Sequence, residues 1–354
     1  TLVVGDVIKA LKSNRYDRRQ IAIGITQTGG QCRATNYLAL IKRAMANEGF
    51  ADIPVIGIAS SESMFNEQPG FKPRWMKLVK PAALSLVFVD CLSRMHYAVA
   101  SREAYRGTSA GLKSKYLDKA IRLLENYSYP DLLPTLKEAV ADFNAVITKH
   151  REVRSVGIVG EIYIKYNSFG QFNVIDWLIE HHIEVILPPL QEFFMQSFVN
   201  TQARCREFID STRKLNFSEH VLEGMANRYI DRFEEVLRSF RFYRPLHPIR
   251  KSAELAAEML NLNNQYGEGW LIPAEIASLA HQRINNVVCM QPFGCIANHI
   301  VGKGMEMKIK SLYPDMNLLY LDFDSGTSRV NVLNRLHFLI QNMEKIKMPL
   351  CPDC

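Results

Sequence analysis

Several features that would identify the protein's class are missing from the sequence. The apolar runs are short: residues 82–89 form one of the longest, well below the ~20 residues that a membrane-spanning helix needs. No basic leader precedes an apolar stretch near the N-terminus, as it would in a secretory signal. We therefore expect a cytoplasmic protein that does not associate with a membrane.

Signatures of nucleotide binding and of common hydrolases are missing as well. No G-x-x-x-x-G-K-S/T segment occurs, no G-x-G-x-x-G follows a predicted strand, and residues 302–304 (GKG) are only a fragment of such a pattern. The G-x-S-x-G and H-E-x-x-H motifs do not occur either. We therefore do not expect this chain to bind ATP.

The chain also lacks a large excess of charge of one sign. Its 43 Lys and Arg residues face 36 Asp and Glu residues, a net charge of +7, and the basic residues are scattered. The densest basic cluster, 238–244 (RSFRFYR), is interleaved with aromatic residues. This pattern favours a solvated helix end with Phe240 and Tyr243 packed inward over a nucleic-acid surface. No nucleic-acid partner is expected.

The length and composition are those of a globular protein with more than one domain. The chain has 354 residues, of which 47% are hydrophobic and 22% charged. We predict a first α/β lobe with a helical segment over 1–150, and a second α/β lobe over 151–354 with a helical insertion at about 190–280. A charged stretch at 149–154 joins the two. The chain begins with Thr1 rather than Met, which indicates a piece of a longer protein.

The hydrophobic pattern predicts strands that alternate with helices. Short apolar runs predict strands at 20–26, 53–59, 155–159, 183–187, 286–290 and 317–323, the third of them continuing through 160–163. Helical spacing predicts helices at 2–11, 34–47, 172–181, 273–280, 296–312 and 329–344. Residues 72–149 are predicted to be mainly helical, with breaks at Pro130 and Pro134. Strands joined through helices run parallel, so the expected fold class is α/β: two Rossmann-like lobes with parallel sheets plus a substantial helical insertion.

The seven cysteines are the unusual part of the composition. An odd number of cysteines in a chain large enough to bury its own core does not suggest a disulfide framework. Two of them, Cys32 and Cys295, follow a predicted strand, a glutamine and a glycine (Gly30 and Gly294), and each precedes a predicted helix. A helix N-terminus stabilises a thiolate, and a preceding glycine lets the backbone approach a bulky inorganic group. Metal-cluster ligation and tight core packing are both open for this pair.

The other cysteines are weaker candidates. Cys91 follows an apolar run and is either a third metal ligand or a helical core residue. Cys289 alternates within an apolar strand, which predicts a core position, and Cys205 lies in a polar helix without an evident role. Cys351 and Cys354 form a C-x-x-C that is half of a possible zinc or redox site.

Acidic residues also follow the predicted strands. Glu161 comes after Gly160 at the end of a strand, where it either holds helix amides or reaches the interface between the lobes. Asp322 and Asp324 form an Asp-x-Asp that is able to bind a cation, but the Asp324 turn is better suited to cap the closing helix.

Five ordered segments of the sequence resemble one protein family over nearly the whole chain. They are 27–37 (QTGGQCRATNY), 159–166 (VGEIYIKY), 266–270 (YGEGW), 291–305 (QPFGCIANHIVGKGM) and 322–335 (DFDSGTSRVNVLNR). Together they resemble the C-terminal part of the large acyl-CoA dehydratase activase-related proteins, relatives of the 2-hydroxyglutaryl-CoA dehydratase system of anaerobes.

The resemblance implies an iron–sulfur protein. In that family, ATPase modules of the acetate and sugar kinase/actin type lie upstream, and relatives hold a [4Fe–4S] cluster through cysteines between Rossmann-like lobes. Carried over, the implied ligands are Cys32 and Cys295, and the implied partners are the upstream ATPase modules and a dehydratase or electron donor. A further family cysteine lies in a Cys-Tyr-Pro-type segment that would precede Thr1. The cluster is therefore expected to be absent or incomplete in this piece.

Three functions remain open from the sequence. The first is an iron–sulfur, dehydratase-component-like domain that transfers electrons through a cluster held between the lobes. The second is a non-catalytic docking or small-ligand-binding module whose cysteines are structural. The third, a nicotinamide or flavin oxidoreductase, is disfavoured because no glycine-rich phosphate-binding fingerprint occurs.

Overall fold

The computed structural model of the chain describes residues 2–27, 33–59, 75–149, 152–207, 209 and 217–345. By their contacts the residues group into two compact units. The smaller unit comprises Thr1–Trp75 with Gly294–Ala297, and the larger comprises Met76–Phe293 with Asn298–Cys354. The domain boundary that we expect near residue 150 remains a prediction.

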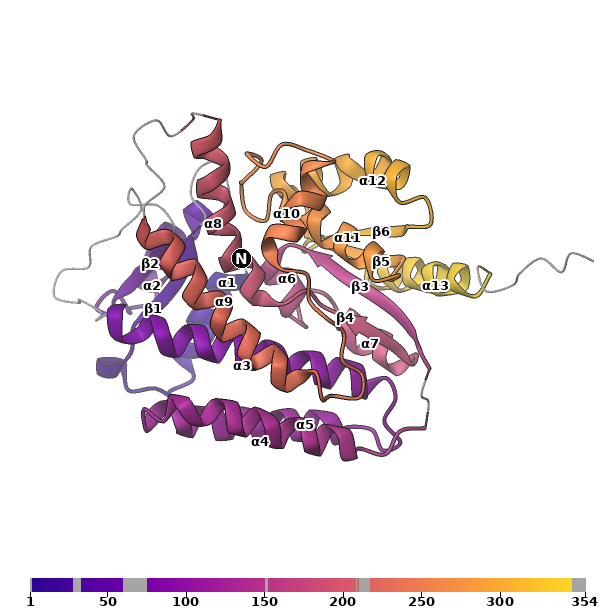
Figure 1. The fold of residues 1–354 in the computed structure, drawn as a ribbon. Coiled ribbons are helices and arrows are strands. Elements are labelled where there is room, and N and C mark those ends of the chain that lie inside the picture. Colours follow the sequence, from indigo (N-terminus) through magenta and orange to yellow (C-terminus); the bar gives the residue numbers. More distant parts are fainter. Residues whose placement is uncertain are drawn as a thin grey trace, which may run out of the picture. The chain divides into compact units, whose positions relative to one another are not determined.

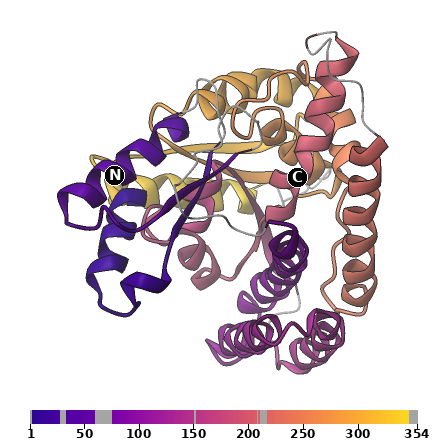
Figure 2. The same ribbon diagram turned by 90° about the vertical axis from the view of Figure 1, so that its left-hand side faces the viewer.

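The smaller unit contains a parallel pair of strands and two helices. Strand β1 (Ile23–Gln27) pairs in parallel with β2 (Val55–Ala59). Helices α1 (Leu2–Lys12) and α2 (Tyr37–Asn47) complete the unit, which is drawn in indigo and violet in Figure 2. The core of the unit is formed by the buried side chains of Leu11, Ile41, Met45, Ile53 and Val55. The strands and helices predicted for this part of the sequence are therefore confirmed.

The larger unit is built on a four-stranded parallel sheet with the strand order β4-β3-β5-β6 (Figure 1). The strands are β4 (Ile183–Ile186), β3 (Arg154–Gly160), β5 (Asn286–Pro292) and β6 (Asn317–Phe323). Each was expected from a short apolar run, and all three pairings are parallel, as the alternating order of strands and helices predicts. The chain is thus a mixed α/β protein with two parallel sheets.

Helices cover both faces of this sheet. Because successive side chains of a strand point to opposite faces, Val288 packs on one face and its neighbour Cys289 on the other. Helices α7 (Val174–Glu180) and α13 (Arg329–Lys345) cover the first face. Helices α10 (Ile249–Ala257), α11 (Leu271–His281) and α12 (Glu306–Leu312) cover the second. Strands buried on both faces explain why their sequences are apolar runs rather than alternating patterns.

Long helices form a further layer of the larger unit. They are α3 (Trp75–Ala100), α4 (Thr108–Glu125), α5 (Leu132–Ala145) and α9 (Phe217–Leu237), which lie alongside one another (Figures 1 and 2). Their shared core includes Phe88, Leu136, Phe143 and Phe233. The described part of the stretch predicted as a helical insertion contains α8 (Leu190–Arg206), α9, α10 and α11. Within the described ranges, no helix has the length and apolar character that a bilayer crossing requires.

Three local predictions were wrong. The third strand does not continue to Tyr163: it ends at Gly160, whose φ of 114° leaves the extended conformation, and helix α6 (Ile162–Tyr166) begins two residues later. The helix expected over 296–312 is broken into a π-helical turn, a 3₁₀ turn and α12, since Gly302 and Gly304 weaken its centre. Pro134 does not break a helix. It lies in the first turn of α5, where a missing N–H costs no helical hydrogen bond.

Candidate functional site

The carboxyl ends of β3 and β5 mark the expected binding edge of the larger unit. From β3 the chain passes to β4 on one side, whereas β5 lies on the other side of β3, so the winding direction changes between β3 and β5. Ligands of open parallel sheets bind outside the strand ends at such a switch point. Gly160 ends β3 here, and the backbone N–H of Glu161 donates to the carbonyl of Met290 in β5 at 2.9 Å.

Two glutamates meet at the start of α6. The Glu161 carboxylate accepts a hydrogen bond from the Ile164 amide at 2.8 Å, and Glu268 accepts one from the Ile162 amide, also at 2.8 Å. Burial, followed by repulsion from Glu268, raises the pKa of Glu161 to about 7. Burial also raises the pKa of Glu268. The sequence leaves two roles open for Glu161, binding helix amides or reaching the interface between the lobes. In the structure its carboxylate binds a backbone amide at the start of α6.

Lys165 of α6 and Glu275 of α11 form a buried ion pair. The Lys165 ammonium donates to the two carboxylate oxygens of Glu275 in α11 at 3.1 and 3.4 Å, and both side chains are buried. Burial lowers the pKa of Lys165, but the charges of Glu275 and Glu268 outweigh it, and the pKa lies above its ordinary value. Burial raises the pKa of Glu275 more than the lysine lowers it. Each ion of the pair therefore depends on the other to remain charged.

The ends of β5 and β6 carry a smaller polar group. The Gln291 side-chain amide donates to Asp322 at 2.6 Å, and His299 Nε2 lies 3.6 Å from the same carboxylate. Asp324 accepts from the Gly326 amide at 2.7 Å, which shapes the turn before α13. Asp322 and Asp324 are thus both engaged within the protein, and the capping of α13 that the sequence favours for the Asp324 turn remains a prediction.

Of the two cysteines that are most strongly expected to bind a cluster, the structure describes only Cys295. Cys295 is half-buried and follows Gly294, which has a left-handed φ of 74°, and both belong by their contacts to the smaller unit. Cys32 and Gly30 lie outside the described residues, as do Cys351 and Cys354. In the parts of the chain that the structure describes, no three His, Cys, Asp or Glu side chains form a group suited to a metal ion.

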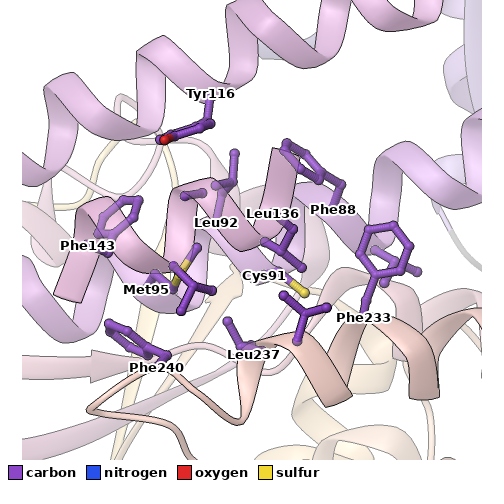
Figure 3. Packing of buried hydrophobic residues seen from close by; sticks show 14 of the residues in the cluster. Phe88, Cys91, Leu92, Met95, Tyr116, Leu136, Phe143, Phe233, Leu237 and Phe240 are labelled. Carbon is purple, nitrogen blue, oxygen red and sulfur yellow. The ribbon is translucent and has the colours of Figure 1, made fainter. Parts of the chain in front are cut away.

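Cys91 lies in the core of the helical layer. It is 1% exposed, and Figure 3 shows its side chain among Leu136, Phe233 and Leu237. Burial raises the pKa of its thiol well above the ordinary range. A metal ligand has to be a thiolate, so this environment favours the core alternative for Cys91. Cys289 is buried in the sheet core, as expected from its strand.

Replacing Cys91 by serine tests this assignment. We expect the Cys91→Ser variant to lose about 1–3 kcal/mol of unfolding free energy, because a hydroxyl without a partner would be buried among apolar side chains. The control Cys205→Ser, at a half-buried helical position, should change stability by less than about 0.5 kcal/mol. Urea unfolding followed by circular dichroism measures both. Equal stability of the two variants would contradict the core position.

Sequence reasoning missed most of the buried charges. Lys165 and Glu268 occur inside segments quoted for the family resemblance, but neither was singled out, and Glu275 was not considered. Glu275 did carry a usable signal: it is the one charged residue among the first ten of the apolar helix segment 271–281 (LIPAEIASLAH). A charge in a helix that is apolar on every side is buried and needs a partner.

Comparison of the whole chain with protein-family models, with curated proteins and with solved structures finds no match.

Proposed function

We propose that this chain is an iron–sulfur, dehydratase-component-like domain of an acyl-CoA dehydratase activase-type protein, and that it transfers electrons through a [4Fe–4S] cluster ligated by Cys32 and Cys295. In this proposal each parallel sheet is part of a Rossmann-like lobe. The upstream ATPase modules gate the transfer, and a dehydratase or an electron donor is the redox partner. Cys91 is left out of the ligand set because it is buried among apolar side chains.

One observation carries the proposal. The segment Gly294–Ala297, which contains Cys295, groups by its contacts with the N-terminal unit, although it directly follows the last strand residues of β5 in the other unit. The N-terminal unit is also the one whose sequence contains Cys32. Two cysteines that ligate one cluster have to lie close together. The grouping of the Cys295 segment with the unit whose sequence contains Cys32 therefore supports a shared cluster.

The residues around Cys295 suit an iron–sulfur cluster. Gly294 has a left-handed φ, so the chain turns sharply just before the thiol. The cysteine is only half-buried and precedes a helical segment, so its thiol is more accessible to a bulky inorganic group than a thiol in an apolar core. A bound cluster supplies one-electron transfer, and the number of thiolates, their hydrogen bonds and their burial set its potential.

Anaerobic reconstitution with iron and sulfide tests the proposal. The chain should be extended upstream to include the Cys-Tyr-Pro-type segment that the resemblance implies. We expect iron and acid-labile sulfide to bind with visible thiolate-to-iron absorbance. Cys32→Ser and Cys295→Ser should each lower bound iron several-fold, since a cubane cluster needs about four ligands.

Two matched controls separate ligation from damage to the fold. Cys205→Ser and Cys289→Ala remove a half-buried and a buried cysteine that the proposal does not use, and both should retain the iron content of the parent chain. Iron binding that is unchanged in Cys32→Ser and Cys295→Ser would overturn the proposal. It would then favour the docking or small-ligand-binding alternative, which the buried, unreactive settings of Cys91 and Cys289 already suit.

A further inference from the structure

The larger unit contains a small cavity that has no part in the proposed electron transfer. It has a volume of about 80 Å³ and lies between α3, α8, α11, the chain that follows β4 and the segment that follows α9. Its walls are mostly apolar and aromatic, with Tyr97, Tyr166, Phe240, Phe242 and Tyr243 among them. All of its lining residues belong to the larger unit, so its shape does not depend on how the two units are placed.

One end of the cavity is acidic. Asp90 of α3 accepts hydrogen bonds from the backbone amides of Leu190 and Gln191 at 3.0 and 2.9 Å, and so holds the start of α8. Glu192, in the first turn of α8, also lines the cavity. Among the described residues, its carboxyl group has neither a hydrogen-bond partner nor an ion-pair partner. It is a polar side chain in a largely apolar enclosure without a protein partner.

The basic residues at the cavity are already committed. Arg94 is paired with Glu234, and it also donates to the carbonyl of Arg244 at 2.7 Å. Arg244 is paired with Glu184 at 2.7 Å. Arg94 therefore has a carboxylate partner of its own, whereas Arg244 shares Glu184 with Arg102, and neither Arg94 nor Arg244 forms an ion pair with Glu192.

His247, another lining residue, does not supply a positive charge. Burial, followed by the neighbouring His281, lowers its pKa, and its buried Nδ1 has no hydrogen-bond partner within the described ranges of the chain. Among the described residues, none of the basic groups at the cavity forms an ion pair with Glu192, so its carboxylate, once ionised, is available to a cationic ligand.

We propose that this cavity binds a small organic ammonium ion, with the Glu192 carboxylate as its ion-pair partner and the tyrosine and phenylalanine rings as its walls. The class of ligand follows from the lining. An unpaired carboxylate selects a cation with N–H donors, and aromatic rings attract organic cations through their π faces. A cavity needs only about 10–15 Å³ of volume on this scale to hold one water molecule, so the volume of about 80 Å³ leaves room for a small cation such as methylammonium.

Binding of such a cation is coupled to proton release. Burial, followed by repulsion from Glu275, raises the pKa of Glu192 to about 8, while Lys165 and Arg94 lower it and Asp90 raises it. In the free protein Glu192 is therefore mostly protonated near neutral pH. A cation favours the ionised form, so binding displaces the proton and strengthens as pH rises toward about 8. The affinity should rise about tenfold from about pH 6 to about pH 7 and about fivefold more by about pH 8, and level off above it.

Isothermal titration calorimetry with methylammonium chloride tests the proposal on the complete chain. We expect saturable binding at about pH 8, and the pH dependence given above. Titrations at about pH 7 in two buffers of different protonation enthalpy should show release of about 0.9 proton per bound cation. Sodium chloride at equal ionic strength should give no saturable heat.

The decisive variant is Glu192→Gln. It should lower methylammonium affinity at least tenfold and abolish the proton release, yet it should fold normally at neutral pH, where Glu192 is already mostly uncharged. Glu254→Gln, a matched change at an exposed position of α10, should bind like the parent chain. The proposal is overturned if methylammonium does not bind saturably, if Glu192→Gln binds it equally well, or if the affinity rises as pH falls. Iron binding plays no part in these measurements, so their outcome is independent of the electron-transfer proposal.

Discussion

Replacing Gly160 by alanine is expected to destabilise the larger unit by about 4 kcal/mol, the sum of about 1–3 kcal/mol of backbone strain and about 1–3 kcal/mol of overpacking. Gly160 has a φ of 114°, and a Cβ at this position would lie 2.1 Å from the carbonyl oxygen of Met290. That oxygen belongs to the backbone of β5 and cannot rotate away as a flexible side chain would. The neighbouring strands would have to separate at their carboxyl ends.

Denaturant unfolding followed by tryptophan fluorescence measures the effect, because Trp270 is fully buried in the larger unit. The control is Gly111→Ala in α4, where an added Cβ meets nothing within 4 Å. This change should be neutral or stabilise the chain by up to about 1 kcal/mol, since alanine is the better helix former. A loss below about 1 kcal/mol for Gly160→Ala would mean that β3 and β5 are not packed as closely as described.

Replacing Lys165 by methionine is expected to cost about 3–5 kcal/mol of unfolding free energy near neutral pH, because it leaves the Glu275 carboxylate buried without its counter-ion. Methionine keeps most of the side-chain volume, so the effect reports charge rather than packing. Without the lysine, Glu275 must take up a proton to remain buried. Its pKa in the folded state then lies above the unfolded value, and the penalty should grow as pH rises from about 5 to about 8.

Two comparisons identify the origin of this loss. The double variant Lys165→Met/Glu275→Gln removes both charges and should recover much of the lost stability. The exposed pair of Lys119 and Glu138 provides the surface control, and Lys119→Met should change stability by at most about 1 kcal/mol. A pH-independent loss in Lys165→Met, or no recovery in the double variant, would contradict the buried ion pair. Chemical denaturation at several pH values measures all three variants.

The strands were the most predictable part of the fold. All six lie where short apolar runs place them. In the four-stranded sheet this is because a strand covered by helices on both faces must be apolar at nearly every position. The ends of elements were less predictable. The stretch after Val159 continues with apolar and aromatic residues, and only the conformation of Gly160 and the hydrogen bond from the Ile164 amide to Glu161 end the strand and begin α6.

The candidate site was predictable only where its residues are close in sequence. Glu161 and Cys295 were expected near strand ends because each follows a glycine at or shortly after the end of an apolar strand run. The meeting of Lys165 with Glu275 was not predictable, since 110 residues separate them and the pairing arises from the packing of α11 beside β3. The same holds for Glu192 and the cavity beside it, which is assembled from α3, α8, α11 and the segments after β4 and α9.

The sequence by itself determined the α/β character of the chain, the places of its strands and most of its helices, and the glycine–cysteine and glycine–glutamate turns that follow two of those strands. These properties depend on local hydrophobic patterns and on backbone preferences that act over a few residues. The tertiary structure decided which charges are buried together, that Cys91 is a core residue, and that Glu192 faces a cavity and has no ion-pair partner in the part of the chain that is described. Burial and pairing depend on elements that are distant along the chain, and they alone set the pKa values and the binding properties of these side chains.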